Sequence, residues 1–340
     1  MRIAAGLALL IAVLAIAESA SSSSRAVQDF GIYEVGIEGS GRTTLLHDPT
    51  VYEVDISRDR TRILLHRLMS NDLYSAAIDG SDLRLVVSAQ SVHGYLGAAT
   101  WSPAGRRVAV EVLTKTSAEI WVAKSDGTSL RRLVGHAIRP AWSPDGRRIA
   151  YIGSFQGHDP AGAITVGMST RPLRPRQLGP IEFGNPDNTD YWTLRWSPRG
   201  DLVGYTTFRD GHERVAIVRA NGPIRRSVTV PRAGRFAAWS PSGKRMLYWE
   251  GASHRIIAAR PDGRGRRFVT ASYGQVGWSP DGRWIASVDK VRNGCYQIFV
   301  LRPNGEGRRR LTDEPCNNSI QVFWSLDSRR IIYKLTVFEP

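Results

Sequence analysis

Six segments of the chain repeat one pattern, a tryptophan followed by a turn sequence and then by a short apolar strand. The clearest copy runs from Trp142 to Tyr151, and a degraded copy without tryptophan begins at Ile56. Counting that one, the seven copies start 39 to 54 residues apart. This period, with strand-type residues, is typical of a β-propeller, in which each repeat forms one four-stranded blade. We expect six large side chains to pack between neighbouring blades: Trp101, Trp142, Trp196, Trp239, Trp278 and Trp324.

Two turn signals divide each repeat into strands. Ser143, Pro144 and Gly146 occupy the first, second and fourth positions of a type I turn, in which proline supplies the fixed φ. About twenty-five residues later, Asp-Gly or Asn-Gly between apolar runs predicts a tight hairpin, as at Asp126-Gly127. One repeat therefore reads as strand A, the Trp-Ser-Pro turn, strand B, strand C, the Asp-Gly turn and strand D.

These motifs resemble the TolB-type (WD-like) propeller repeats, which also occur in the propeller domains of prolyl oligopeptidase-like enzymes. The resemblance extends over nearly all of the chain after residue 30 and implies an all-β propeller. TolB itself has a small α/β domain before its propeller, and we expect no such domain here. The repeat serves many roles, so the resemblance alone does not identify a function.

The first residues have the pattern of a secretory signal peptide, with Arg2 before an apolar run from Ile3 to Ala17 and small residues after it. We therefore expect a signal peptide over 1–20, a disordered spacer over 21–29 and the propeller over 30–340. The predicted location is secreted or periplasmic, with no stable membrane span after cleavage. An uncleaved N-terminal anchor is the alternative.

The two chain ends each carry half of a repeat. Residues 32–46 match strands C and D, and the chain ends after strands A and B near Tyr333. Pairing these halves closes the ring and removes exposed sheet edges. Together with six complete repeats this predicts seven blades. The alternative is six blades, with the segment at Ile56 forming something else.

The two faces of the predicted disc differ. The A–B and C–D turns are uniformly tight, whereas the opposite face carries long B–C and D–A loops, a pattern that favours that face for binding. The alternative is that the lengths of these surface loops have drifted neutrally. The candidates in the long loops are His158, Asp159, Glu182, Asp187 and Asp190. At the predicted channel mouth, side chains that could bind a ligand or simply plug the channel are Tyr95, Arg139, Tyr191, Arg235, Tyr273 and Gln321.

The net charge is +15, and many of the arginines cluster on the C–D hairpins, such as those at 308–310. They could attract an anionic surface, or they could reflect a genome rich in arginine. We do not expect nucleic acid as a partner, because no nucleic-acid-binding motif is present. The two cysteines, Cys295 and Cys316, flank the Asn304-Gly305 hairpin, so a disulfide is predicted in an oxidising compartment.

The chain lacks a Gly-x-Ser-x-Gly elbow, a His-Glu-x-x-His motif and a phosphate-binding Gly-rich loop. We therefore expect no catalytic residues, no metal site and no cofactor, although the acidic loop residues could bind Ca²⁺. The sequence favours a monomeric, secreted, non-enzymatic scaffold that binds a protein, peptide or polysaccharide. The alternative is a propeller enzyme, a metal-assisted glycan lyase or a lactone hydrolase, with its site at the channel mouth.

Overall fold

A computed structural model describes residues 27–67, 69–155, 158–168, 175–180, 193–209, 212–221, 228–230, 233–251, 253–292 and 294–338. Apart from the short helix α2 (Ala89–Val92), the regular elements in these ranges are β-strands. The predicted signal peptide over 1–20 lies outside the described residues. Strand β1 begins at Val27, so the predicted spacer is corrected at its end: three of its residues belong to the propeller. No helix in the described ranges has the length and apolarity needed to cross a membrane.

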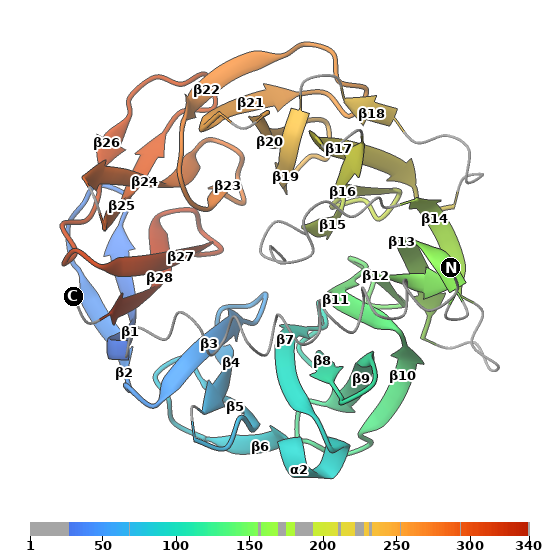
Figure 1. The fold of residues 1–340 in the computed structure, drawn as a ribbon. Helices are drawn as coiled ribbons and strands as arrows, with labels where there is room; N and C mark the ends of the chain where they lie inside the picture. Colours follow the sequence, from blue (N-terminus) through green and yellow to red (C-terminus); the bar gives the residue numbers. More distant parts are fainter. Residues whose placement is uncertain are drawn as a thin grey trace.

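The described strands form seven four-stranded antiparallel sheets arranged around a common centre, which confirms an all-β propeller (Figure 1). The segment at Ile56, on which the number of predicted blades depended, belongs to a sheet of its own, β3 to β6. The first three sheets along the chain are β3 (Val51–Ile56), β4 (Arg62–Arg67), β5 (Leu73–Ala77) and β6 (Arg84–Val87); β7 (Tyr95–Trp101), β8 (Arg107–Leu113), β9 (Ala118–Lys124) and β10 (Arg131–Gly135); and β11 (Ala137–Trp142), β12 (Arg148–Phe155), β13 (His158–Gly167) and β14 (Arg176–Pro180).

The next three sheets follow in chain order around the ring. They are β15 (Leu194–Trp196), β16 (Leu202–Arg209), β17 (His212–Arg219) and β18 (Val228–Val230); β19 (Ala233–Trp239), β20 (Met246–Glu250), β21 (Arg255–Ala259) and β22 (Arg267–Ala271); and β23 (Val276–Trp278), β24 (Ile285–Arg292), β25 (Cys295–Leu301) and β26 (Arg309–Arg310).

The remaining sheet joins the two ends of the chain, as predicted. Its order is β2 (Thr43–His47), β1 (Val27–Gly36), β28 (Arg330–Phe338) and β27 (Asn318–Trp324). Tyr33 on β1 lies opposite Tyr333 on β28 in the antiparallel register. Because β1 pairs along its whole length, the ring closes by backbone hydrogen bonds rather than by side-chain packing alone.

The tight turns have the geometry that their residues predict. The amide of Gly146 donates to the carbonyl of Ser143 at 2.8 Å, and Gly146 has a φ of 66°. The Asp145 carboxylate accepts from the Ser143 hydroxyl and from the Arg147 amide. These bonds hold the pKa of Asp145 below its usual range, so the turn contains an ionised carboxylate.

The tryptophan before each of the six turns has a physical reason. All six contribute to clusters packed between adjacent sheets; Trp278 is half-buried and the other five are buried. Four of the indoles also donate a hydrogen bond to a backbone carbonyl in the preceding sheet. The bonds run from Trp142 to Thr100, from Trp196 to Ala141, from Trp239 to Arg195 and from Trp324 to Gly277, at 3.0 to 3.3 Å.

The degraded repeat replaces this link with an arginine. Arg60 stands where five of the six other turns have glycine and the sixth has Ser328, and its φ is 62°. Its Nε donates to the carbonyl of Trp324 at 2.7 Å, so the side chain ties this sheet to the composite sheet. The side chain of Ile56 has no hydrogen-bond donor, so Arg60 supplies the bond to the neighbouring sheet that the indole makes in other repeats.

Candidate binding face and ring centre

The strand directions place all B–C and D–A connections at one end of the ring, which we call the loop face. Four large apolar side chains that are strongly exposed lie there, among the described residues: Met69, Tyr95, Tyr273 and Val291. Tyr95 begins β7 and is 42% exposed, and Tyr273 lies between β22 and β23 and is 46% exposed. Exposed aromatic side chains on one face are the type of surface that binding partners use.

Tyr273 is held in place by a neighbouring ring. It stacks on the imidazole of His254, with 3.6 Å between ring centroids and 24° between the planes. His254 belongs to the connection between β20 and β21, so a B–C loop supports a D–A segment. The stack fixes Tyr273 without burying it, which lowers the entropy cost of placing the ring against a partner.

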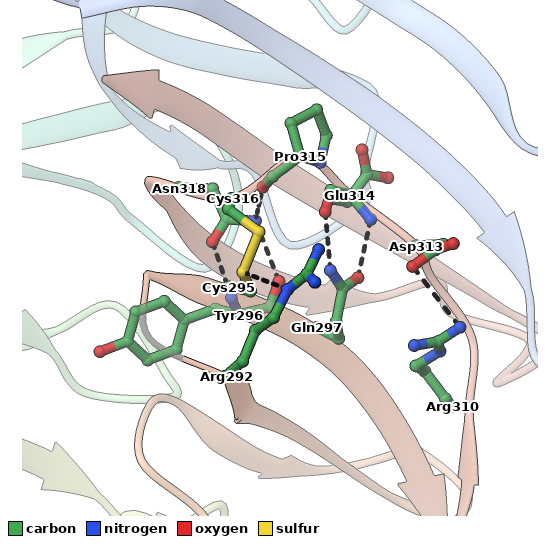
Figure 2. The surroundings of a disulfide bond; sticks show 10 residues. All are labelled: Arg292, Cys295, Tyr296, Gln297, Arg310, Asp313, Glu314, Pro315, Cys316 and Asn318. Carbon is green, nitrogen blue, oxygen red and sulfur yellow. Dashed lines mark hydrogen bonds and ion pairs between the residues drawn. A yellow bond between two sulfur atoms is a disulfide. The ribbon is translucent and has the colours of Figure 1, made fainter. Parts of the chain in front are cut away.

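A second part of the loop face is fixed by a disulfide, as predicted. Cys295 and Cys316 are bonded, with 4.1 Å between their Cα atoms. Figure 2 shows the segment beside it held by side chains of β25 and β27. Gln297 exchanges two 2.8 Å bonds with the backbone of Glu314, and Asn318 accepts from the Tyr296 amide at 3.0 Å. This D–A segment is therefore a rigid part of the face.

The structure places three further predicted mouth residues on innermost strands of the sheets, Arg139 on β11, Arg235 on β19 and Gln321 on β27. The guanidinium of Arg235 lies 5.0 Å above the ring of Trp249 and 3.7 Å from the carboxylate of Glu213. The backbone amide of Arg139 donates to Glu111 at 3.1 Å. Gln321 lies half-buried on β27. Each of these contacts joins strands of one sheet or of two adjacent sheets.

The remaining predicted site residues are the mouth residue Tyr191 and the five residues of the long loops. Tyr191, Glu182, Asp187 and Asp190 lie outside the described residues, and so do the side chains of His158 and Asp159, whose backbone begins β13. Within the described ranges, no three His, Cys, Asp or Glu side chains come close enough together to hold a metal ion.

Sequence reasoning missed a pair of charges at the ring centre. Asp55 on β3 and Arg195 on β15 each stand one position before the residue that packs between sheets, Ile56 and Trp196. The innermost strands follow one another in the order β3, β7, β11, β15, so β3 and β15 lie on opposite sides of the ring (Figure 1). Nevertheless the charge of Arg195 lowers the pKa of Asp55 and the charge of Asp55 raises the pKa of Arg195, so the two side chains lie within electrostatic range of each other.

Burial dominates the electrostatics of this pair. Desolvation raises the pKa of Asp55 above its usual value, against hydrogen bonds from Trp101 and Thr100 and the charge of Arg195. Desolvation also lowers the pKa of Arg195, and the nearby charge of Arg139 acts in the same direction. The centre therefore holds charges that bulk water does not fully solvate.

The arginines of the C–D hairpins are largely engaged within the ring. Arg308 pairs with Asp289 at 2.6 Å and lies 3.8 Å above the ring of Phe299. Arg309 pairs with Glu38 at 2.9 Å, and Arg266 pairs with Glu250 at 2.5 Å. An anion-attracting hairpin face stays a prediction, with fewer available cations than the sequence suggests.

Comparison with known proteins identifies the family. The model of the TolB beta propeller domain matches residues 56–277, which is more than half of the chain. The chain belongs to the TolB β-propeller family. No curated protein matches it.

Solved structures similar to this TolB-type propeller include proteins of different activities. A TolB structure from Agrobacterium tumefaciens aligns with a TM-score of 0.51 at 15% identity, over 92% of this chain and 99% of that one. An oligogalacturonate lyase in complex with manganese aligns with a TM-score of 0.58 at 11% identity, over 93% and 94%. A puromycin-hydrolysing peptidase from Mycobacterium tuberculosis aligns with a TM-score of 0.59 at 15% identity, over 85% of this chain and 52% of that one. At these identities the likeness shows the fold alone.

Proposed function

We propose that this TolB-type propeller is a non-enzymatic binding scaffold outside the cytoplasm, and that a protein, peptide or polysaccharide partner contacts its loop face. One observation carries this proposal: Tyr95 and Tyr273 are exposed at the same end of the ring, and Tyr273 is fixed there by stacking on His254. Such side chains supply contact area with little loss of side-chain entropy.

The rigidity of the face supports the same role. The disulfide and the bonds of Gln297 and Asn318 hold the segment before β27, and sheets closed into a ring hold the rest. A preorganised surface loses less entropy on binding than a mobile one. The disulfide and the signal-like first twenty residues both favour an oxidising compartment, secreted or periplasmic.

A photo-crosslinking amino acid placed at Tyr95 or at Tyr273 tests the proposal in the native cells. The matched control position is Leu326, which is 57% exposed in an A–B turn at the opposite end of the ring. We expect one defined adduct from each tyrosine position and none from Leu326. Equal adducts from all three positions, or none from the tyrosines, would contradict binding at the loop face.

Metal analysis of the purified protein tests the enzymatic alternative. The proposed scaffold needs no metal, whereas a metal-assisted lyase or hydrolase requires one at its site. Stoichiometric, tightly bound metal would overturn the scaffold and favour an enzyme.

A further inference from the structure

Seven equivalent positions surround the ring axis near the tight-turn end. Each is the residue immediately before the inter-sheet tryptophan, or before Ile56, on the innermost strand of its sheet. We call them the axial ring: Asp55, Thr100, Ala141, Arg195, Ala238, Gly277 and Phe323. None of the seven is buried, whereas the residues that follow them are buried or, at Trp278, half-buried. These side chains therefore border the axis without being packed into the core, although the charges of Asp55 and Arg195 are poorly solvated there.

The axial ring has room for a ligand group. A Cβ atom added at Gly277 would meet no atom within 4 Å, so the space beside it is open. Alanine occupies two further positions, 141 and 238. Two of these three small residues, Ala238 and Gly277, stand between the larger Arg195 and Phe323 in the order around the ring.

The charged hydrogen-bond donors of the axial ring belong to Arg195. In the part of the chain that the structure describes, no hydrogen bond or ion pair joins its guanidinium to another group, although its side chain is exposed to the axis. In the described ranges no hydrogen bond and no ion pair within 4.0 Å joins Asp55 to these donors, and the Asp55 carboxylate accepts from the backbone amide of Trp101 at 3.1 Å. The planar guanidinium is suited to two parallel bonds with a carboxylate.

We propose that the axial ring binds the carboxylate at the C-terminal end of a peptide through the guanidinium of Arg195. The innermost strands surround the site on all sides, so a ligand must approach along the axis with its end first (Figure 1). This site is separate from the loop face and does not depend on the partner proposed there.

A peptide end suits the ring better than a sugar acid does. Ala141, Ala238, Gly277 and Phe323 carry no side-chain hydrogen-bonding group. The backbone carbonyls of Thr100, Ala141, Arg195 and Gly277 already accept from tryptophans. A hydroxyl-rich sugar would leave donors unpaired here, which is costly. A peptide whose last residue is small and apolar would place that side chain beside Phe323 and leave no side-chain donor unpaired.

Calorimetric titration of the purified protein with N-acetyl-trialanine, and with the same peptide as its C-terminal amide, tests the proposal. We expect binding of the free acid and at least tenfold weaker binding of the amide, because the amide lacks the anionic group. This comparison needs no variant. Equal binding of acid and amide, or no binding of the acid at millimolar concentration, would overturn the proposal.

Variants then assign the site. Arg195→Gln should weaken binding of the acid about tenfold to a hundredfold. Asp55→Asn should tighten it about threefold to tenfold, because the competing charge is removed. Gly277→Leu should abolish it while the protein stays folded. Arg267→Gln, at an exposed position on β22, is the control and should have no effect.

The proposal predicts opposite effects on binding in the Asp55 and Arg195 variants. If the two residues only stabilised the fold, both variants would weaken binding. Weaker binding in both variants, or unchanged binding in Gly277→Leu, would contradict the site. A digalacturonate ligand that binds through Arg195 while the peptide acid does not would overturn the peptide end as the ligand.

Discussion

Arg42 and Glu314 form a two-bond ion pair although 272 positions separate them in the chain. Arg42 Nε and Nη2 donate to the two carboxylate oxygens of Glu314 at 3.1 and 3.2 Å. The hydroxyl of Tyr333 also donates to Glu314, and the Arg42 guanidinium lies 4.0 Å above the ring of Tyr33. The cluster therefore connects both strands at the closure, β1 and β28, to the segment after β26.

The first prediction concerns the ion pair between Arg42 and Glu314. Arg42→Ala should lower the free energy of unfolding by about 1.5–3 kcal/mol, because the nearly buried Glu314 carboxylate loses two charged hydrogen bonds. Denaturant unfolding measures the change. Arg310→Ala is the control, because Arg310 pairs with the exposed Asp313 and such pairs contribute about 0–1 kcal/mol. Equal losses in both variants would show that Arg42 does not secure the closure.

The second prediction concerns the disulfide. Its two cysteines are 21 positions apart, and closing a loop of that size stabilises a protein by about 3 kcal/mol. Reduction should lower the unfolding midpoint of the wild type, whereas the Cys295→Ser/Cys316→Ser variant should start low and not respond to reductant. A midpoint in the wild type that reductant leaves unchanged would contradict a stabilising role.

The third prediction concerns pH. Burial raises the pKa of Asp55 in the folded protein, so the folded state favours the protonated form more than the unfolded state does. The stability that this group contributes is present at acid pH. It should decline as pH rises from the ordinary value of 3.8 through the raised one. Compared with the wild type, Asp55→Asn should therefore become relatively more stable over that interval.

Unfolding free energies of both proteins, measured at steps from pH 3 to pH 8, give this difference directly. Taking the difference removes the contributions of other titrating groups. A difference that is constant with pH, or that changes in the opposite direction, would show that Asp55 is not held at a raised pKa.

The fourth prediction compares two tryptophans. The indole of Trp239 donates to the Arg195 carbonyl at 3.1 Å, whereas the buried indole nitrogen of Trp101 has no hydrogen-bond partner among the described residues. Both changes to phenylalanine remove similar buried area. Trp239→Phe should cost about 1 kcal/mol more than Trp101→Phe, the value of one hydrogen bond. Thermal unfolding tests this, and equal costs would mean that the indole bonds add nothing to packing.

The sequence was informative about the fold because each blade repeats a local chemical pattern. The turn at Ser143, the tryptophan before it and the Asp126-Gly127 hairpin depend on neighbouring residues, and these predictions are confirmed. The pairing of Tyr33 with Tyr333 was also predictable, because two half-repeats at the chain ends can complete only each other. The disulfide followed from the positions of its cysteines around one hairpin.

The site was less predictable because it depends on side chains that the ring brings together from different sheets. Asp55 and Arg195 lie in different repeats, and each looks like an ordinary polar residue within its own strand. A signal was available: aligned on their tryptophans, these are the two charged residues at a position otherwise small, polar or aromatic. The pairing of hairpin arginines such as Arg308 with Asp289 also required three-dimensional coordinates.

The loop face is tested most directly by the affinity of the crosslinked partner, once isolated, for three forms of the protein. We predict that Tyr95→Ala/Tyr273→Ala raises the dissociation constant at least tenfold over the wild type, since exposed aromatic anchors carry much of an interface's free energy. Leu326→Ala, on the opposite face, should leave it unchanged. Equal dissociation constants for all three forms, or a larger loss with Leu326→Ala, would contradict binding at the loop face.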